Sequence, residues 1–465
     1  MSEGLAALSN QVARELSLLR YPHRDWLSPR RTSAGAHVYD VVIVGGGQSG
    51  LAVAFGLMRE RVGNLLVVDE HPLDRAGPWL NFARMHTLRT PKYLTGPDLG
   101  IPSLTPQAWY EAQFGAGSWE ALGLLPKEQW ASYLAWYRQT LGIPVQPDTK
   151  VDALRWQDGV WEVPCERYGV HSLLYARRVV LATGIDGSGR WEVPALVRDA
   201  LPQDRYAHTH DPIDFAALRG KRVAVLGAGA SAFDNAATAL EAGASEARMF
   251  FRRSELVRVN PYRWAEFVGF LKHLADLEDH DKWRFVAQLV RMGQLPPKDT
   301  YLRARAHAHF HLHPGSSFRR LSMQGDELVL DTESGTYRAD FLILGTGFVT
   351  DLRLRPELAL VEPHIARWRD RYTPADDERL EDLLNHPYLG PNFEFIERRR
   401  GAAPYLASLY NYTFGGLLSM GFGGASISGM KYSVPRLVAG ITRSLFIEDR
   451  EQHFAGLCGF AETEF

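Results

Sequence analysis

The segment that decides the fold of this 465-residue chain is Tyr39-Asp-Val-Val-Ile-Val-Gly-Gly-Gly-Gln-Ser-Gly50. An apolar run with strand character leads directly into the GxGxxG spacing of Gly45, Gly47 and Gly50. Glycines in such a turn let the backbone approach a pyrophosphate, which lies at the positive end of the following helix. Because a helical stretch and a second strand, Leu65–Val68, follow, the segment predicts a βαβ unit that binds a dinucleotide.

A second fingerprint occurs at Arg222-Val-Ala-Val-Leu-Gly-Ala-Gly-Ala-Ser-Ala232. Gly227, Gly229 and Ala232 repeat the spacing, and Ala230 and Ser231 begin the predicted helix. Two nucleotide sites in one chain point to electron transfer between two bound nucleotides. The fold class is therefore α/β with two Rossmann-like dinucleotide-binding domains.

The residues after each second strand suggest which ribose each site recognises. Asp69 and Glu70 follow the first, where a carboxylate accepts hydrogen bonds from ribose hydroxyls. Arg252 and Arg253 follow the second, and two guanidinium groups suit a 2′-phosphate, so NADPH is expected there. A solvated basic turn is the alternative interpretation of these arginines. In the first site the phosphates are expected over the amides of Gly45–Gly50, which include Gln48 and Ser49.

Two more apolar strands end in a small residue followed by Thr-Gly, at Arg178–Ile185 and Asp340–Phe348. With these the chain resembles the class B-type flavoprotein monooxygenases, namely flavin-containing and Baeyer–Villiger monooxygenases and the bacterial N-hydroxylating enzymes. The resemblance extends over about residues 38–445. It implies that the first fingerprint binds FAD and the second NADPH, with Thr183, Thr346 and Gly347 where the chain passes between the domains.

The resemblance also implies that the NADPH domain is inserted in the FAD domain, in a glutathione-reductase-like arrangement. The chain would return through 301–313 and the strand 341–344 to complete the FAD domain, and helices around 264–292 could cover the active site. The expected divisions are an N-terminal arm over 1–37, the first part of the FAD domain over 38–205, the NADPH domain over 206–303, and the second part of the FAD domain with a C-terminal helix over 304–465.

The flavin-facing residues are inferred from the same resemblance. Ala76-Gly-Pro-Trp79 matches a Gly-Gly-x-Trp pattern in which Ala76 replaces the first glycine, and Trp79 is expected at the cofactor. The stretch that follows is expected beside the isoalloxazine, with contacts from His86, Thr87, Leu88 and Arg89. Positive charge from His86 and Arg89 would stabilise the reduced flavin anion, so these two are catalytic candidates. A structural loop with solvent-facing cations is the alternative.

Two C-terminal stretches complete the candidate site. Asn411, between two tyrosines, is a third catalytic candidate that could line a substrate pocket, although aromatic core packing is the commoner role of such rings. Gly424, Ala425 and Ser426 precede a predicted helix over 431–446. In two-dinucleotide flavoproteins a late helix directs its N-terminus at the flavin, and its dipole favours negative charge there. Ala425 and Ser426 are therefore expected at the cofactor.

The family's fingerprint, FxGxxxHxxx followed by an aromatic residue, is degenerate here. His208 and Thr209 fit its centre, while Pro202, Asp204 and Pro212 replace the expected Phe, Gly and aromatic. The mismatch favours N- or S-oxygenation over Baeyer–Villiger insertion. A linker histidine bonded to backbone is an equal alternative for His208.

Composition excludes several other classes. Fifty-two basic and 54 acidic side chains give a net charge of −2, which provides no basic surface for nucleic acid. No run of about 18 apolar residues predicts a membrane span, and the first residues lack the pattern of a signal peptide. Two cysteines without a motif favour a cytoplasmic protein without structural disulfides. The alternating histidines of His307–His313 would lie on one side of a strand without Cys or carboxylate partners, so no metal site is expected.

The sequence thus predicts an FAD- and NADPH-dependent monooxygenase that acts on a small molecule and O2. Hydride would pass from NADPH to FAD, O2 would add at flavin carbon 4a, and one oxygen atom would go to the substrate. An NADPH-dependent flavin oxidase or reductase, a Baeyer–Villiger enzyme and a non-catalytic nucleotide sensor are the alternatives. The substrate and the oligomeric state are left open, with a homo-oligomer as one option.

Overall fold

The first fingerprint joins strand β2 (His37–Val44) to helix α2 (Gln48–Arg59), as predicted. The computed structural model describes residues 2–19, 24–424 and 426–465. β2 pairs in parallel with β3 (Leu65–Val68) and β8 (Val170–Leu181), and its last five residues are all buried. Strands covered on both faces need apolar side chains throughout, which explains the unbroken Val-Val-Ile-Val run.

These strands belong to a nine-stranded sheet with the order β4-β3-β2-β8-β7-β5. Strands β5 to β8 form an antiparallel meander at one side of this sheet, and β19 adds in parallel beside β8 although more than 200 residues separate them in sequence. The remaining strands of this sheet are β1 (Arg30–Arg31), β4 (Val145–Gln146), β5 (Lys150–Val151), β6 (Arg155–Gln157), β7 (Val160–Arg167) and β19 (Leu409–Asn411).

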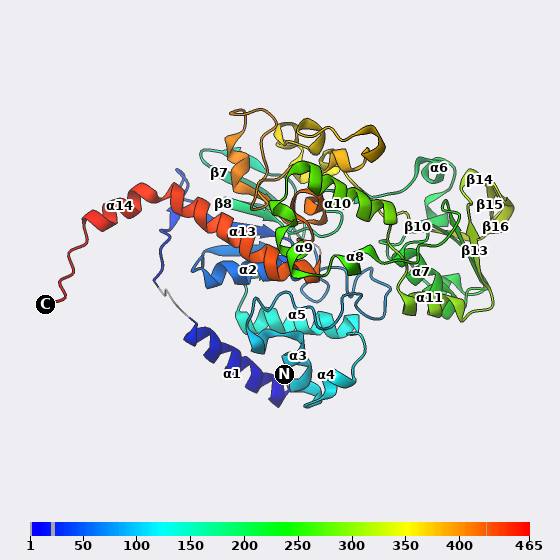
Figure 1. Ribbon diagram of the computed structural model, residues 1–465, viewed down its shortest axis with the longest axis horizontal. Helices are drawn as coiled ribbons and strands as arrows, with labels where there is room; N and C mark the ends of the chain where they lie inside the picture. The colour runs from blue at the N-terminus through cyan, green and yellow to red at the C-terminus, as the bar shows by residue number, and fades with distance from the viewer. Residues whose placement is uncertain (1, 20–23, 425) are drawn as a thin grey trace.

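The second fingerprint lies in a separate five-stranded parallel sheet with the order β10-β17-β11-β12-β13. The fingerprint joins β11 to α7 (Ala230–Glu241), and an antiparallel three-stranded sheet accompanies this lobe, seen on the right of Figure 1. The strands are β10 (Tyr206–His208), β11 (Arg222–Leu226), β12 (Glu246–Phe251), β13 (Phe310–Pro314), β14 (Phe318–Gln324), β15 (Glu327–Thr332), β16 (Gly335–Ala339) and β17 (Phe341–Leu344).

The boundary expected after residue 303 is wrong. β13 pairs with β12, and β17 pairs with both β10 and β11, so the two strands expected to complete the first domain belong to the second sheet. An apolar strand such as Phe341–Leu344 suits a buried position in either sheet, and only pairing distinguishes the two. The second domain therefore runs from about 206 to 344, and the chain returns to the first domain after Gly345–Gly347.

The helical elaboration expected over 264–292 exists as α8 (Pro261–Trp264), α9 (Val268–His273) and α10 (Asp279–Met292). These helices reach back to the first domain, where α9 packs on α13 (Ile427–Glu448) and α10 on α12 (Leu417–Met420). They share an apolar core with the first domain and thus form a bridge between the lobes (Figure 1).

The N-terminal arm contains α1 (Glu3–Leu18), which packs on α3 (Pro106–Phe114). No helix among the described residues combines the length and the apolar character needed to cross a membrane. The remaining elements are α4 (Ser118–Ala121), α5 (Lys127–Leu141), α6 (Ala195–Arg198), α11 (Lys298–Arg305), α14 (Arg450–Cys458), β9 (Gly189–Trp191) and β18 (Phe348–Thr350).

Candidate functional site

The first glycine loop is shaped by its protein neighbours at two positions and open at the third. Gly45 has φ +110°, and a Cβ there would lie 2.4 Å from the Ala182 carbonyl oxygen. A Cβ at Gly50 would lie 1.8 Å from the Gly45 carbonyl oxygen. Gly47 differs, because a Cβ there would meet only the Gly77 backbone, with Cα at 3.6 Å and N at 3.9 Å, and it caps α2 without a side-chain hydrogen bond. The free backbone at this helix N-terminus fits a phosphate group.

The side chains that follow are already used within the protein. Gln48 Oε1 accepts a hydrogen bond from Trp130 Nε1 at 3.1 Å, and the Ser49 hydroxyl donates to the Gly424 carbonyl. Gln48 and Ser49 are therefore available to a cofactor mainly through their backbone amides. The Ser49 bond also brings the C-terminal loop to the fingerprint.

The C-terminal loop ends at the N-terminus of α13. Ser426 is half-buried there, and its hydroxyl lies 2.9 Å from that of Ser428. Ala425, the other residue expected at the cofactor, lies outside the described residues.

The two carboxylates after β3 have different positions. Asp69 is 8% exposed, and its oxygens accept the backbone N–H groups of Gly46 at 2.6 Å and His71 at 2.8 Å. Burial raises the pKa of Asp69, an effect that these two hydrogen bonds oppose. Asp69 braces the glycine loop with both of its oxygens, and its contact with ribose stays a prediction. Glu70 is exposed and remains the candidate for the ribose hydroxyls.

The second glycine loop repeats the first. Gly227 has φ +117°, and a Cβ there would lie 2.3 Å from the Gly345 carbonyl oxygen. A Cβ at Gly229 would meet nothing within 4 Å, and Ser231 is exposed at the uncapped N-terminus of α7. Ala230, between them, is buried. The open backbone at Gly229 and Ser231 fits a second pyrophosphate.

The two Thr-Gly segments are the crossings between the domains, as expected. Each rests against the first glycine of a fingerprint, and the chain beyond them pairs as β9 and β18, with Phe348 opposite Trp191. Thr346 donates its hydroxyl to the Glu192 carbonyl. Thr183 Oγ1 and Trp79 Nε1 are buried without a hydrogen-bond partner in the described part of the chain. Unsatisfied polar atoms beside an open glycine loop are what a site for a polar cofactor requires.

The arginines after β12 differ in availability. Arg253 donates to the carbonyls of Arg291, at 2.9 Å, and Met292, at 3.5 Å, which close α10. Arg252 is exposed and makes no ion pair or hydrogen bond with the described residues. Arg252 is therefore the freer of the two for a 2′-phosphate, and Arg253 joins the helical bridge to the second domain.

The segment expected beside the isoalloxazine lies in the contact between the domains. Arg89 Nη2 is 2.7 Å from Asp234 of α7, Thr87 donates to Asp299 of α11 at 3.3 Å, and Leu88 is buried. His86 is exposed, with Nε2 4.0 Å from a carboxylate oxygen of α7. The expectation that Arg89 supplies free positive charge to the flavin is wrong, because a buried carboxylate already pairs with it.

Asn411 is fully buried and faces no open surface. Its amide nitrogen donates to Ser188 Oγ at 3.1 Å, and its oxygen accepts from Thr413 Oγ1 at 2.9 Å. Both ends of the Asn411 amide are thus used within the protein, and the assignment of Asn411 as catalytic stays a prediction. The Asn411 side chain ties β19 to the first crossing.

A cluster of aromatic and histidine rings lies at the crossings, and the sequence pointed to only some of its members. Trp191 stacks on His210 with ring centroids 4.8 Å apart, and Phe82 lies 4.4 Å from His210. His208 Nδ1 accepts the His210 backbone N–H at 3.1 Å, which supports the linker interpretation. Burial lowers the pKa of His208 to about 4, so its ring is neutral at physiological pH. The two histidines were visible in the degenerate fingerprint, whereas no pattern pointed to Phe82 or Trp191.

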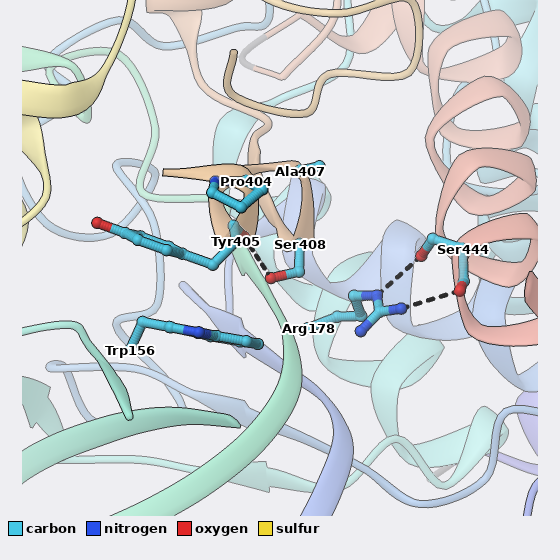
Figure 2. A pocket seen from close by; sticks show the side chains of 7 residues that line it. All are labelled: Trp156, Arg178, Pro404, Tyr405, Ala407, Ser408 and Ser444. Atoms are coloured by element: carbon cyan, nitrogen blue, oxygen red, sulfur yellow. Dashed lines mark hydrogen bonds between the residues drawn. The ribbon is translucent and has the colours of Figure 1, made fainter. Parts of the chain in front are cut away.

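A pocket of about 390 Å³ lies elsewhere, between the meander and the C-terminal half of α13. Figure 2 shows the rings of Trp156 and Tyr405 on one side and Arg178 bonded to Ser444 on the other. Ser444 is about 25 Å along α13 from the helix N-terminus beside the glycine loop. This pocket is therefore separate from the nucleotide sites.

Comparison with known proteins agrees with this geometry. The family described as pyridine nucleotide-disulphide oxidoreductase matches residues 42–282. The chain is 45% identical over 468 residues to the FAD-dependent urate hydroxylase of Xanthomonas campestris pv. campestris, covering 99% of this chain and 97% of that protein.

Solved structures share the fold. The ornithine hydroxylase of Pseudomonas aeruginosa is similar with a TM-score of 0.70 and 16% identity, over 88% of this chain and 100% of that one. The ornithine N-hydroxylase of Kutzneria sp. 744, with reduced FAD, NADP⁺ and L-ornithine, has a TM-score of 0.66 and 15% identity, over 88% and 99% of the chains.

Proposed function

The chain belongs to the pyridine nucleotide-disulphide oxidoreductase family, as a flavoprotein monooxygenase of the class B type, and we propose that it hydroxylates urate or a closely related purine with FAD, NADPH and O2. The main support for this proposal is the full-length similarity to a urate hydroxylase, at 45% identity. Two open glycine loops, each seated on a Thr-Gly crossing, support the use of two nucleotides. Hydroxylation of a purine ring differs from the N- or S-oxygenation favoured by the sequence, although both reactions transfer one oxygen atom from O2 to the substrate.

The residues present fit both nucleotides. The amides of Gly45–Gly50, Glu70, Trp79 and Thr183 would hold FAD, which when bound supplies the ring that accepts hydride and reacts with O2. Gly229, Ser231 and Arg252 would hold NADPH.

The chain's own contribution at the crossings is positioning and the exclusion of water. The rings of Phe82, Trp191 and His210 cover the junction with apolar surface, which protects reactive species from solvent. His208 is held neutral by burial and contributes no charge there.

A reducing, cytoplasmic setting is part of the proposal. Cys165 is buried, Cys458 is exposed, and both are free thiols. An exposed free thiol is better tolerated in a reducing compartment.

The test measures oxygen transfer directly. Purified protein reconstituted with FAD is mixed with NADPH, urate and ¹⁸O-labelled O2, and the product is examined by mass spectrometry. We expect NADPH consumption stimulated by urate and one labelled oxygen atom in the product, with weaker activity on xanthine and none on L-ornithine. NADPH consumption that yields only hydrogen peroxide with every purine would support the oxidase alternative, and labelled product from L-ornithine alone would replace the purine assignment.

A further inference from the structure

Arg89 makes a charged contact between the two domains. This side chain comes from the first domain, and its Nη2 lies 2.7 Å from Asp234 Oδ2 on α7 of the second domain. Asp234 is 2% exposed, so its charge is stabilised by protein groups and hardly by water. Removal of Arg89 would deprive the buried Asp234 carboxylate of the cationic group that lies nearest to it.

Asp234 has further partners within the second domain. Thr300 Oγ1 donates to its Oδ1 at 2.9 Å, and Arg303 Nη1 lies 3.4 Å from the same oxygen. Arg303 also pairs with Glu241, at 3.0 and 2.8 Å. Contacts within the second domain thus hold the Asp234 carboxylate between α7 and α11 independently of Arg89. The second domain therefore offers a rigid hydrogen-bond acceptor to the first.

The position of Asp234 along α7 links this pair to the nucleotide site. Ser231, at the open N-terminus of α7, precedes Asp234 by three residues, or about one helical turn. The helix that would receive the NADPH phosphates is therefore held by a side chain of the flavin domain. Thr87 adds a second bond from the same segment, to Asp299 of α11.

We propose that Arg89 and Asp234 are positioning residues that fix the orientation of the two nucleotide domains for hydride transfer. The proposal rests on the proposed function, in which NADPH reduces FAD. The apolar bridge of α8–α10 joins the two domains but includes no residue of α7, so the orientation of α7 depends on contacts such as that of Arg89. A displacement of about 1 Å costs a transfer step about 100-fold. Arg89 touches neither nucleotide in this role and acts through α7.

The test uses substitutions that remove charge while keeping shape. Asp234→Asn retains an oxygen for Thr300, Arg89→Met retains length, and the double variant measures their coupling. Arg222→Met is the matched control, because Arg222 pairs with Asp340 at 2.6 Å entirely within the second domain. The anaerobic rate of flavin reduction at saturating NADPH is measured, together with the reaction of dithionite-reduced protein with O2.

We expect each single variant to lower the reduction rate by about tenfold or more, with the double variant no worse than the singles. The dissociation constant for NADPH, the FAD content and the rate of reoxidation should change by less than about threefold. Arg89→Lys should restore part of the rate. Unchanged reduction in both single variants, or losses that multiply in the double variant, would overturn the proposal.

A second measurement separates this proposal from the proposed function. Hydrogen exchange of 84–90 and 230–241 should be faster in Asp234→Asn and Arg89→Met than in the wild type, while 160–181 in the meander should be unaffected. This readout needs no NADPH. If the wild type were not reduced by NADPH, the proposed function would fail while faster exchange still supported the interdomain contact, and unchanged exchange would overturn the contact itself.

Discussion

Gly47→Asp should abolish flavin binding while leaving the apoprotein as stable as the wild type. A Cβ at Gly47 would meet only the Gly77 backbone, with Cα at 3.6 Å and N at 3.9 Å, which is ordinary van der Waals contact. Gly47 is also the N-cap of α2 and has extended backbone, φ −72° and ψ −173°. Because Asp is a better N-cap than Gly by a few tenths of a kcal/mol, the helix should gain slightly.

The same carboxylate would occupy the place of the FAD pyrophosphate. A charge about 4 Å from a phosphate, at an effective dielectric constant of about 20, is repelled by about 4 kcal/mol. This corresponds to a loss of about 10³ in affinity. Gly47→Asn is the matched control, since it has nearly the same shape without the charge.

The assay compares two quantities in three proteins. Thermal denaturation of the apoproteins reports stability, and quenching of flavin fluorescence on titration reports the dissociation constant for FAD. We expect equal melting temperatures and a difference of about 10³ in affinity between the Asp and Asn variants. Wild-type FAD affinity in the Asp variant would refute the placement of the pyrophosphate, and a destabilised apoprotein would refute the reading of Gly47 as sterically open.

Three other substitutions test individual residues. Arg252→Ala should raise the KM for NADPH about 10- to 100-fold and leave that for NADH unchanged, because a charge-assisted bond to a phosphate contributes about 1.5–3 kcal/mol. Arg253→Ala, which loses hydrogen bonds to the end of α10, should change the KM for NADPH and the KM for NADH equally. If steady-state kinetics showed NADPH-specific loss in Arg253→Ala and equal loss in Arg252→Ala, Arg253 would be the residue that binds the 2′-phosphate. Asn411→Ala should lower the free energy of unfolding by about 1–3 kcal/mol without changing flavin content; a slower reaction at unchanged stability would return Asn411 to the active site. Burial lowers the pKa of His386 to about 4, so the unfolded chain takes up a proton at this residue at a higher pH than the folded protein does. The free energy of unfolding is therefore unaffected by this group above pH 6.5 and declines by up to about 3 kcal/mol as the pH falls to 4. His386→Asn, which can still donate to the Gly415 carbonyl, should flatten this decline in denaturation curves, and an unaltered pH profile would contradict the assignment.

Local patterns predicted the nucleotide loops well but not the use of each side chain. The spacing of Gly45, Gly47 and Gly50 gave the loop, and the structure adds that only Gly47 is free to face a ligand. Asp69 and Glu70 are equivalent as sequence, yet the first points inward at the loop and the second outward. Both residues lie beyond the end of β3 (Leu65–Val68), so their directions are set by the loop that follows and not by the strand.

Contacts between distant segments escaped sequence reasoning altogether. The sequence suggests that Arg89 is a cation beside the flavin, whereas the structure shows that it pairs with Asp234, which lies 145 residues later. Asn411 reads as a polar residue among rings until Ser188 is seen beside it. Such partners lie far apart along the chain and are linked by no short-range pattern.

The sequence by itself determined two dinucleotide-binding units, their order and the crossings between them, because glycine spacing and apolar strand runs are local requirements of backbone geometry. Only the tertiary structure decided that Phe341–Leu344 belongs to the second sheet and that Arg89 forms an ion pair with α7. Strand pairing and buried ion pairs are chosen by the free energy of the whole packed chain, in which segments hundreds of residues apart compete for the same neighbours.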